Sequence, residues 1–290
     1  MRKKYSIGID SYRFCIPKSI ALKFLKKLEL YSKLRKTTRN AQVDMYVKDK
    51  FKSQNPSELK YPLNIRYINL KRGVKSLSNT ILVLENTKEL HELARKHKKK
   101  LDYYVMIVFA GLHQPSKDIE SYVFSVLAKF LRRFKTYSFD LAMDFESAQE
   151  VSYKAKEWLS SKLLKWSNGK IISVGKSLYA NHILDSSKYF KLNKILLYDK
   201  FHKQRFYHKE NIPPELSQWR RLELTFNIKS KFTALIENEG INEAIDVIND
   251  IGRAIGACSL VGCNINILSK QVRMLLDLRH KYVFKAWIKG

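Results

Sequence analysis

Three short segments in the middle of the chain alternate apolar and ionisable residues with a period of two, as β-strands with two different faces do. They read FDLAMDF at 139–145, KILLYDK at 194–200 and RLELTF at 221–226. In each segment one face is mostly apolar and suits contact with a layer of helices. The other face carries the ionisable residues Asp140, Asp144, Tyr198, Lys200, Arg221 and Glu223. The sequence therefore predicts strands of one sheet whose second face is polar.

The rest of the chain mixes strand and helix patterns. Further strands are expected at 5–16, 79–86 and 101–111, with a turn leading into another at 167–176, and helices at 19–36, 87–100, 116–135 and 148–166. Residues 39–75 are polar and are expected to form an exposed connection, and Ser116 is expected to cap the helix that follows it. We predict an α+β fold with a mostly antiparallel central sheet flanked by helices. An α+β catalytic and DNA-binding domain is expected over 1–228, and a helical C-terminal region over 229–290, which can pack on the same domain.

The chain is strongly basic, with 55 Lys and Arg against 27 Asp and Glu, a net charge of +28. A globular protein with this charge repels itself, so an anionic partner is expected, with nucleic acid as the first candidate and an anionic membrane surface as the second. No apolar run approaches the ~20 residues of a membrane span, and the N-terminus has no signal-peptide pattern. The three cysteines lack metal-site spacing and are expected to be reduced thiols in the core of a cytoplasmic protein.

Two basic segments are candidate DNA contacts. RKHKKK at 95–100 includes Lys98, Lys99 and Lys100 and is interpreted as a clamp on the DNA backbone in preference to a solvated helix end. KFHKQRFYHK at 200–209 interleaves aromatic rings with cations, including Lys203 and Arg205. Such a mixture suits stacking on unpaired bases together with phosphate contact. His113, which follows a strand, is expected to be structural.

The acids on the polar face allow two interpretations. A half-exposed antiparallel sheet could pair them with bases across strands. Alternatively, because neighbouring carboxylates are costly unless a cation neutralises them, they could hold Mg²⁺ or Mn²⁺. A metal together with a tyrosine suits phosphodiester transesterification, in which the hydroxyl attacks phosphorus and leaves a phosphotyrosine and a free 3′-OH. The hydroxyl of Tyr198 needs a nearby cation or base, and Lys200 shares its face.

The motifs FDLAMDF, LLYDK and WRRLELTF, in this order and after the strand YYVMIVFAG, resemble the replication initiation factor family of rolling-circle plasmids. Relatives of that family occur among transposon relaxases and filamentous-phage initiators, and the resemblance covers about residues 100–230. It implies a relaxase-like fold without paired histidines, and a site-specific nicking and joining of one DNA strand through a covalent phosphotyrosine in DNA replication. By position, Tyr198 resembles the nucleophile, Lys200 its cationic neighbour and Arg221 a phosphate contact. Asp140, Asp144 and Glu223 resemble ligands of Mg²⁺ or Mn²⁺.

The sequence also departs from the family pattern. Ser138 and Leu196 stand where many members have arginine, and Lys203 stands where many have an acid. These departures leave Tyr179, Tyr189 and Tyr207 as alternative nucleophiles. They also leave two other functions open, a catalytically silent DNA-binding factor in replication or recombination and an RNA-binding or RNA-processing protein. The expected partner is single-stranded DNA or a melted origin and not a membrane; a second copy of the chain and host helicase or replication proteins are further candidates.

Overall fold

The computed structural model describes residues 5–36, 63–70, 79–86, 88–96, 104–113, 119–148, 151, 171–181 and 190–228. The strands are β1 (Tyr5–Pro17), β2 (Arg35–Lys36), β3 (Leu63–Asn69), β4 (Thr80–Asn86), β5 (Tyr104–Ala110), β6 (Ser138–Glu146), β7 (Ile171–Val174), β8 (Ser177–Asn181), β9 (Phe190–Asp199) and β10 (Trp219–Ile228). The helices are α1 (Lys18–Lys27), α3 (Lys88–Lys96), α4 (Ser121–Arg133) and the short α6 (Lys200–His202). Single turns η1 (Tyr31–Lys33), η5 (Lys203–Tyr207) and η6 (Pro214–Leu216) complete the described elements.

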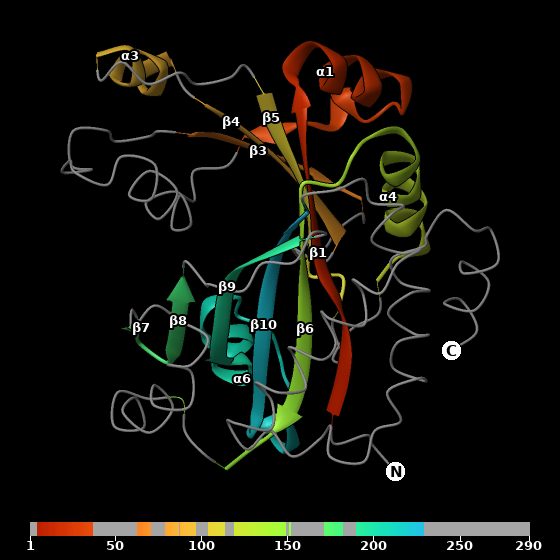
Figure 1. The fold of residues 1–290 in the computed structure, drawn as a ribbon. Coiled ribbons are helices and arrows are strands. Elements are labelled where there is room, and N and C mark those ends of the chain that lie inside the picture. Colours follow the sequence, from red (N-terminus) through yellow and green to blue (C-terminus); the bar gives the residue numbers. More distant parts are fainter. Residues whose placement is uncertain are drawn as a thin grey trace.

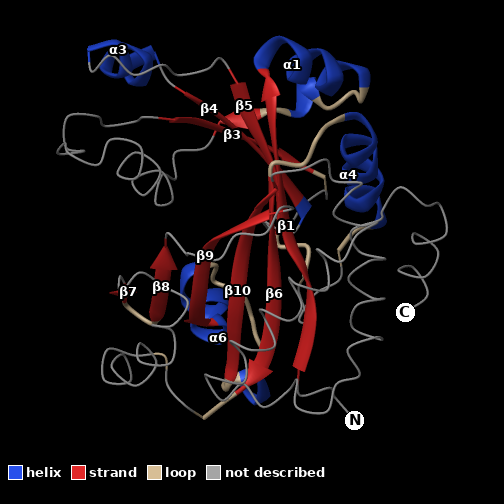
Figure 2. Cartoon of the chain, viewed as in Figure 1, coloured by secondary structure: helices blue, strands red, loops and turns tan. Residues whose placement is uncertain are grey.

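All ten strands belong to one sheet in the order β2-β3-β4-β5-β1-β6-β10-β9-β8-β7. Every described strand pair is antiparallel. Figures 1 and 2 show the strongly twisted sheet running through the molecule with the helices beside it. The predicted α+β class with a mostly antiparallel sheet is confirmed.

The strand order repeats on the two sides of the central pair of β1 and β6. On one side β1 is followed by β5, β4 and β3, and on the other β6 is followed by β10, β9 and β8. In each half the first strand therefore pairs with the last one. The helix α3 joins β4 to β5, and the turns α6 and η5 join β9 to β10 at the corresponding place. The three predicted strands of the polar face are β6, β10 and β9, so they are neighbours in the second half.

An aromatic cluster attaches α1 and α4 to one face of the sheet. Phe130 of α4 lies 5.6 Å from Phe14 of β1 and 5.3 Å from Phe109 of β5, measured between ring centroids. Phe24 of α1 packs edge-on against Phe130 at 5.0 Å and against Phe134 at 4.9 Å. Burying several aromatic rings on one face supplies much of the hydrophobic stabilisation of this part of the fold. The opposite face of the central strands is left to the polar residues.

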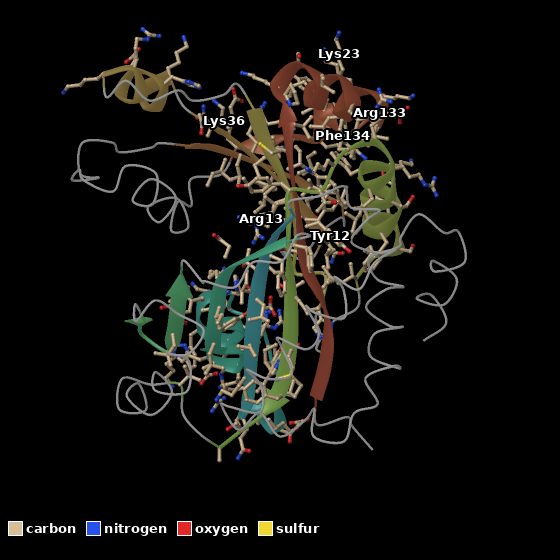
Figure 3. All side chains as sticks on the ribbon, viewed as in Figure 1. Tyr12, Arg13, Lys23, Lys36, Arg133 and Phe134 are labelled. Carbon is tan, nitrogen blue, oxygen red and sulfur yellow. The ribbon has the colours of Figure 1, made fainter. Side chains whose placement is uncertain are left out.

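A β-bulge at Asp10 changes which residues of β1 face the core. Ile9 pairs with Leu141 and Ser11 pairs with Asp140, so Asp10 is an extra residue between two consecutive pairs. Ile9 and Tyr12 can therefore both lie on the apolar face, and Figure 3 shows Tyr12 and Arg13 on opposite sides of β1. The bulge places the carboxylate of Asp10 among the polar residues of the other face.

Several expected element boundaries are wrong. The first helix ends at Lys27 and not near residue 36, because the chain turns there through Glu29 with a φ of 56°. The helix α4 begins at Ser121, with Glu120 and not Ser116 before it. The strand β3 lies inside the predicted exposed connection at 39–75, although Leu63, Ile65 and Tyr67 alternate there with Asn64 and Arg66. Of the expected helix at 148–166 only Ala148 and Val151 are among the described residues, and the C-terminal region at 229–290 lies outside them. Cys15 is exposed on β1, so its expected place in the core is wrong.

The polar face is also less exposed than its composition indicates. Asp140, Asp144, Tyr198, Arg221 and Glu223 are all buried. The expected exposure of this face is therefore wrong for these residues. The pairing of its acids with bases across strands is confirmed, since Arg221 contacts Asp144 and Arg13 contacts Asp140 from neighbouring strands. Among the helices of the described part of the chain, none is long and apolar enough to span a bilayer.

Candidate active site

The register of the sheet brings the predicted residues into rows across three strands. Arg221 of β10 pairs with Asp144 of β6 on one side and with Tyr198 of β9 on the other. Two residues further along β10, Glu223 lies between Ala142 and Leu196. Because paired residues in a sheet point to the same face, the nucleophile candidate, the acids and the arginine share one side, as the alternation predicted.

Arg221 is at the centre of this face and its side chain is fully buried. Its Nε and Nη2 donate hydrogen bonds to the two oxygens of Asp144 at 2.7 and 2.8 Å. Its Nη1 donates to Asp10 Oδ1 at 2.7 Å, and Nη2 also donates to the backbone carbonyl oxygen of His113 at 2.7 Å. All three nitrogens are therefore bound by groups of the protein itself. In this arrangement its donors bind Asp144, Asp10 and the carbonyl oxygen of His113. The phosphate contact of Arg221 stays a prediction.

The carboxylate of Asp144 accepts further bonds from two aromatic side chains. Trp219 Nε1 donates to Oδ1 at 2.8 Å, and His113 Nε2 lies 3.2 Å from Oδ2. Burial alone would raise the pKa of Asp144, but Arg221 and the His113 hydrogen bond hold that pKa well below its usual range. We call Asp10, His113, Asp144, Trp219 and Arg221 the Arg221 cluster.

Asp140, four residues before Asp144 on β6, is also paired with an arginine. Arg13 donates to its two oxygens at 2.9 and 2.5 Å. The hydroxyls of Ser11 and Thr225 each donate to it at 2.6 Å. Burial opposes ionisation, but Arg13 holds the pKa of Asp140 below its ordinary value. The cations that compensate both aspartates are thus arginines of the chain.

A single metal ion does not fit the three predicted carboxylates in this arrangement. Asp140 and Asp144 are four residues apart on one strand, which separates them by about 13 Å, whereas oxygens that share one such ion lie within about 5 Å of each other. Their oxygens are also engaged by arginine donors. Among the described residues, no group of three or more His, Cys, Asp or Glu is arranged to hold a metal. A requirement for Mg²⁺ or Mn²⁺ stays a prediction.

Tyr198 lies near the end of β9 with only 2% of its surface exposed. Its hydroxyl is 3.5 Å from Glu223 Oε2, and Glu223 Oε1 is 3.7 Å from Lys194 Nζ. Burial raises the pKa of Tyr198 well above 10, Arg221 opposes the shift, and Glu223 adds to it. A neighbouring cation, Arg221, thus lowers this pKa as expected, but burial outweighs it and the net shift of the pKa is upward.

Two lysines flank Tyr198. Lys200 is buried, and its Nζ lies 5.9 Å from the centre of the Tyr198 ring and 5.7 Å from that of Trp219. Burial lowers the pKa of Lys200 to about 7, and the nearby Arg221 adds to the shift. Lys203 Nζ lies 4.6 Å from the centre of the Tyr198 ring, and burial lowers its pKa as well. A neutral amine can therefore exist beside the tyrosine near pH 7, and Lys203 contacts its ring.

The other predicted site residues are dispersed. Arg205 and Tyr207 are exposed on η5. Tyr179 is half-buried on β8 opposite Leu196, and burial raises its pKa. Tyr189 and the DNA-contact lysines Lys98, Lys99 and Lys100 lie outside the described residues.

Sequence reasoning missed Asp10 and Arg13 as members of the site and quoted Trp219 only as part of the motif WRRLELTF. The structural role expected for His113 agrees with its contact with Asp144. His113 packs directly against β1, because a Cβ on Gly8 would overlap its imidazole ring. The irregular spacing of the acid in SIGIDSYR, after a glycine in a strand, was a readable signal for a bulge with a close contact. Nothing in the linear order links Asp10 to Arg221, which is 211 residues away.

Comparisons with known proteins add a distant likeness. No family model matches the chain, and no curated protein matches it. Among solved structures, the chain is similar to the rolling circle replication initiator protein from Geobacillus stearothermophilus, with a TM-score of 0.30 and 13% identity over 78% of this chain and 75% of that chain. A likeness at this TM-score agrees with the family resemblance of the motifs and adds no argument to it.

Proposed function

We propose that this protein binds DNA and nicks and rejoins one strand through a covalent bond to Tyr198, as an initiator of rolling-circle-type replication. The observation that supports this proposal is the row of Asp144, Arg221 and Tyr198 across three adjacent strands, with Lys200 beside the tyrosine. A tyrosine held rigidly in a sheet, with the amines of Lys200 and Lys203 at 5.9 and 4.6 Å from the centre of its ring, supports a role in attack on a phosphodiester. The net charge of +28 supports a polyanionic substrate.

In the proposed step, neutral Lys200 takes the proton from the hydroxyl of Tyr198. The phenolate oxygen forms a bond to phosphorus as the bond from phosphorus to the 3′ oxygen breaks. The leaving 3′ oxygen takes the proton from Lys200, which yields a 5′-phosphotyrosine and a free 3′-OH. Rejoining is the reverse of this step.

The other residues of the face have positioning and charge roles in this proposal. The Arg221 cluster fixes the strands around the tyrosine, since its ion pairs join β1, β6 and β10. Lys203, whose Nζ lies over the Tyr198 ring, can swing to the phosphate when DNA arrives and so uncover the ring. This motion is needed because Tyr198 is only 2% exposed without a substrate.

The same burial favours a second candidate, a DNA-binding factor without cleavage activity. The hydroxyl of Tyr198 faces Glu223, and its raised pKa disfavours the phenolate. If these contacts persist on DNA, the face is a structural core and only the basic surface is functional.

A covalent-capture experiment distinguishes the two candidates. The protein is incubated with end-labelled single-stranded DNA of mixed sequence, with Mg²⁺ or Mn²⁺ and in parallel with chelator, and adducts are resolved on a denaturing gel. We expect an adduct with the wild type and with Tyr207→Phe, which keeps an exposed ring, and none with Tyr198→Phe. An adduct that persists in Tyr198→Phe would exclude this tyrosine as the nucleophile. A wild type that binds DNA and never forms an adduct would favour the second candidate.

A further inference from the structure

The connection between β9 and β10 carries exposed aromatic rings beside the candidate active site. Phe206 is 59% exposed and Tyr207 is 71% exposed, more than any other large apolar side chains in the described part of the chain. The ring of His202 lies 4.7 Å from that of Phe206 and 6.0 Å from that of Tyr207, measured between centroids. We call these three rings, His202, Phe206 and Tyr207, the aromatic platform.

Exposed basic side chains, Arg205 and Lys209, belong to the same connection as the aromatic platform. The guanidinium of Arg205 lies 5.9 Å from the centre of the Phe206 ring and 5.6 Å from that of Phe201. Residues 200–209 contain three lysines, one arginine and no acid. A basic surface with exposed rings is complementary to a strand that offers both phosphates and unpaired bases. A purely apolar partner would leave these charges without counter-ions.

The backbone that carries the rings is held in place. Asp199 caps the segment by accepting a hydrogen bond from the backbone nitrogen of His202 at 2.8 Å. The buried Gln204 donates to Glu210 Oε2 at 2.8 Å, and the backbone nitrogen of Glu210 donates to the carbonyl oxygen of Gln204 at 3.1 Å. The segment closes as a π-helical turn, a form that is rare and concentrated at functional sites. A preformed platform loses little conformational entropy when bases stack on it.

The position of the platform relates it to Tyr198. Lys203, in the same turn, has its Nζ 4.6 Å from the centre of the Tyr198 ring. A strand with bases on Phe206 and Tyr207 would therefore pass near Tyr198. We infer that the aromatic platform stacks unpaired bases of single-stranded DNA and thereby places a neighbouring phosphate at Tyr198. This inference rests on the proposed function for the identity of that phosphate, but base stacking can be tested without cleavage.

The test compares binding of the full chain to fluorescent oligo-dT and to an abasic strand of equal length, at several salt concentrations. We expect Phe206→Ala with Tyr207→Ala to weaken binding of oligo-dT about tenfold for each ring and to leave abasic binding nearly unchanged. Since no charge is lost, the slope of log affinity against log salt should stay the same. Arg205→Gln should instead lower that slope by about 0.7.

The control replaces two exposed aromatic residues elsewhere, Tyr122→Ala with Tyr137→Ala, and should bind like the wild type. Oligo-dT affinity that does not change in the platform variant, or falls equally on the abasic strand, would overturn the inference. It would also be overturned if the platform variant lost binding to phosphatidylserine vesicles but kept oligo-dT, or if oligo-U bound more tightly than oligo-dT. If binding depends on the platform but no adduct forms, the proposed nicking is contradicted and the stacking inference stands. If an adduct forms but binding does not depend on the platform, the stacking inference is contradicted and the proposed nicking stands.

Discussion

Arg221→Met should destabilise the protein strongly and reverse the pH dependence of its stability. The substitution removes a fully buried guanidinium and nearly keeps the volume of the side chain. It leaves the buried Asp144 and the partly buried Asp10 without the cation that both of them contact at 2.7 Å. It also leaves the carbonyl oxygen of His113 without this donor.

The size of the effect follows from the type of interaction that is broken. Removing one partner of a buried ion pair typically costs about 3–5 kcal/mol of unfolding free energy, because the other charge stays buried. With a urea slope of about 3 kcal/mol per M for a chain of this size, the midpoint of unfolding should fall by about 1–1.7 M. The measurement is urea denaturation followed by tryptophan fluorescence at pH 7.

The pH dependence provides a second and independent sign. In the wild type, the folded-state pKa of Asp144 is lowered, so its contribution to stability is present above the unfolded-state value near 4 and is lost as pH falls. In Arg221→Met, burial without the arginine should raise the pKa of the two acids above their unfolded-state values. The unfolding free energy of the variant should therefore increase as pH falls from 7 to 5. Over the same range, titration of these acids should change the unfolding free energy of the wild type little.

The matched control is Arg133→Met, which removes an exposed arginine at the end of α4 and should leave the midpoint nearly unchanged. Figure 3 shows Arg133 at the surface, away from β10. If Arg221→Met unfolded at the same urea concentration as Arg133→Met, or lost stability on acidification as the wild type does, the cluster would not have the structural role that its contacts indicate.

Three further predictions concern single groups of the site and its surface. The wild-type nicking rate should rise through pH about 7 as Lys200 loses its proton, and Lys200→Met should abolish this rise, which a rate–pH profile measures. Deprotonation of the buried amine should also raise the unfolding free energy of the wild type above that pH. Lys200→Met should remove this gain, which urea titrations at pH 7 and 9 measure. Gly8→Ala should lower the unfolding free energy by about 1–3 kcal/mol, since the new methyl group overlaps the His113 ring. The control is Gly175→Ala, where a Cβ has open space but a strained φ, and calorimetry of both variants shows whether the overlap matters. Replacing the lysines at 98–100 together with glutamine should lower the salt slope of duplex binding by up to about 2.7, and an unchanged slope would remove this run from the interface.

The polar face could be predicted from the sequence because strand alternation has a strict period of two. Asp144, Tyr198, Arg221 and Glu223 each stand in a segment where every second residue is apolar, so their shared side follows from local pattern alone. The strands β6 and β10 were predictable for the same reason, and β4 and β5 because they are short runs of apolar, branched and aromatic residues. β3 was not predicted, although Leu63, Ile65 and Tyr67 alternate with polar residues, because the polar stretch with prolines before it favoured an exposed connection.

The chemistry of the acids could not be predicted from the same pattern. Composition indicates that buried carboxylates need cations, but not which cation is near them. Arg13 and Arg221 reach Asp140 and Asp144 only through pairings between strands that are more than 70 residues apart in the chain. The partial neutralisation of Lys200 is likewise a result of burial that depends on the closed fold.

The most direct test of the proposed function is to map the residue that becomes linked to DNA. The wild-type protein would be reacted with single-stranded DNA, digested with trypsin and nuclease, and analysed by tandem mass spectrometry for a peptide that carries a 5′-phosphonucleotide. We expect the modification on Tyr198, in the tryptic peptide ILLYDK at residues 195–200. A modification on Tyr179, Tyr189 or Tyr207, or a complete absence of modified peptide from DNA-bound protein, would contradict the assignment.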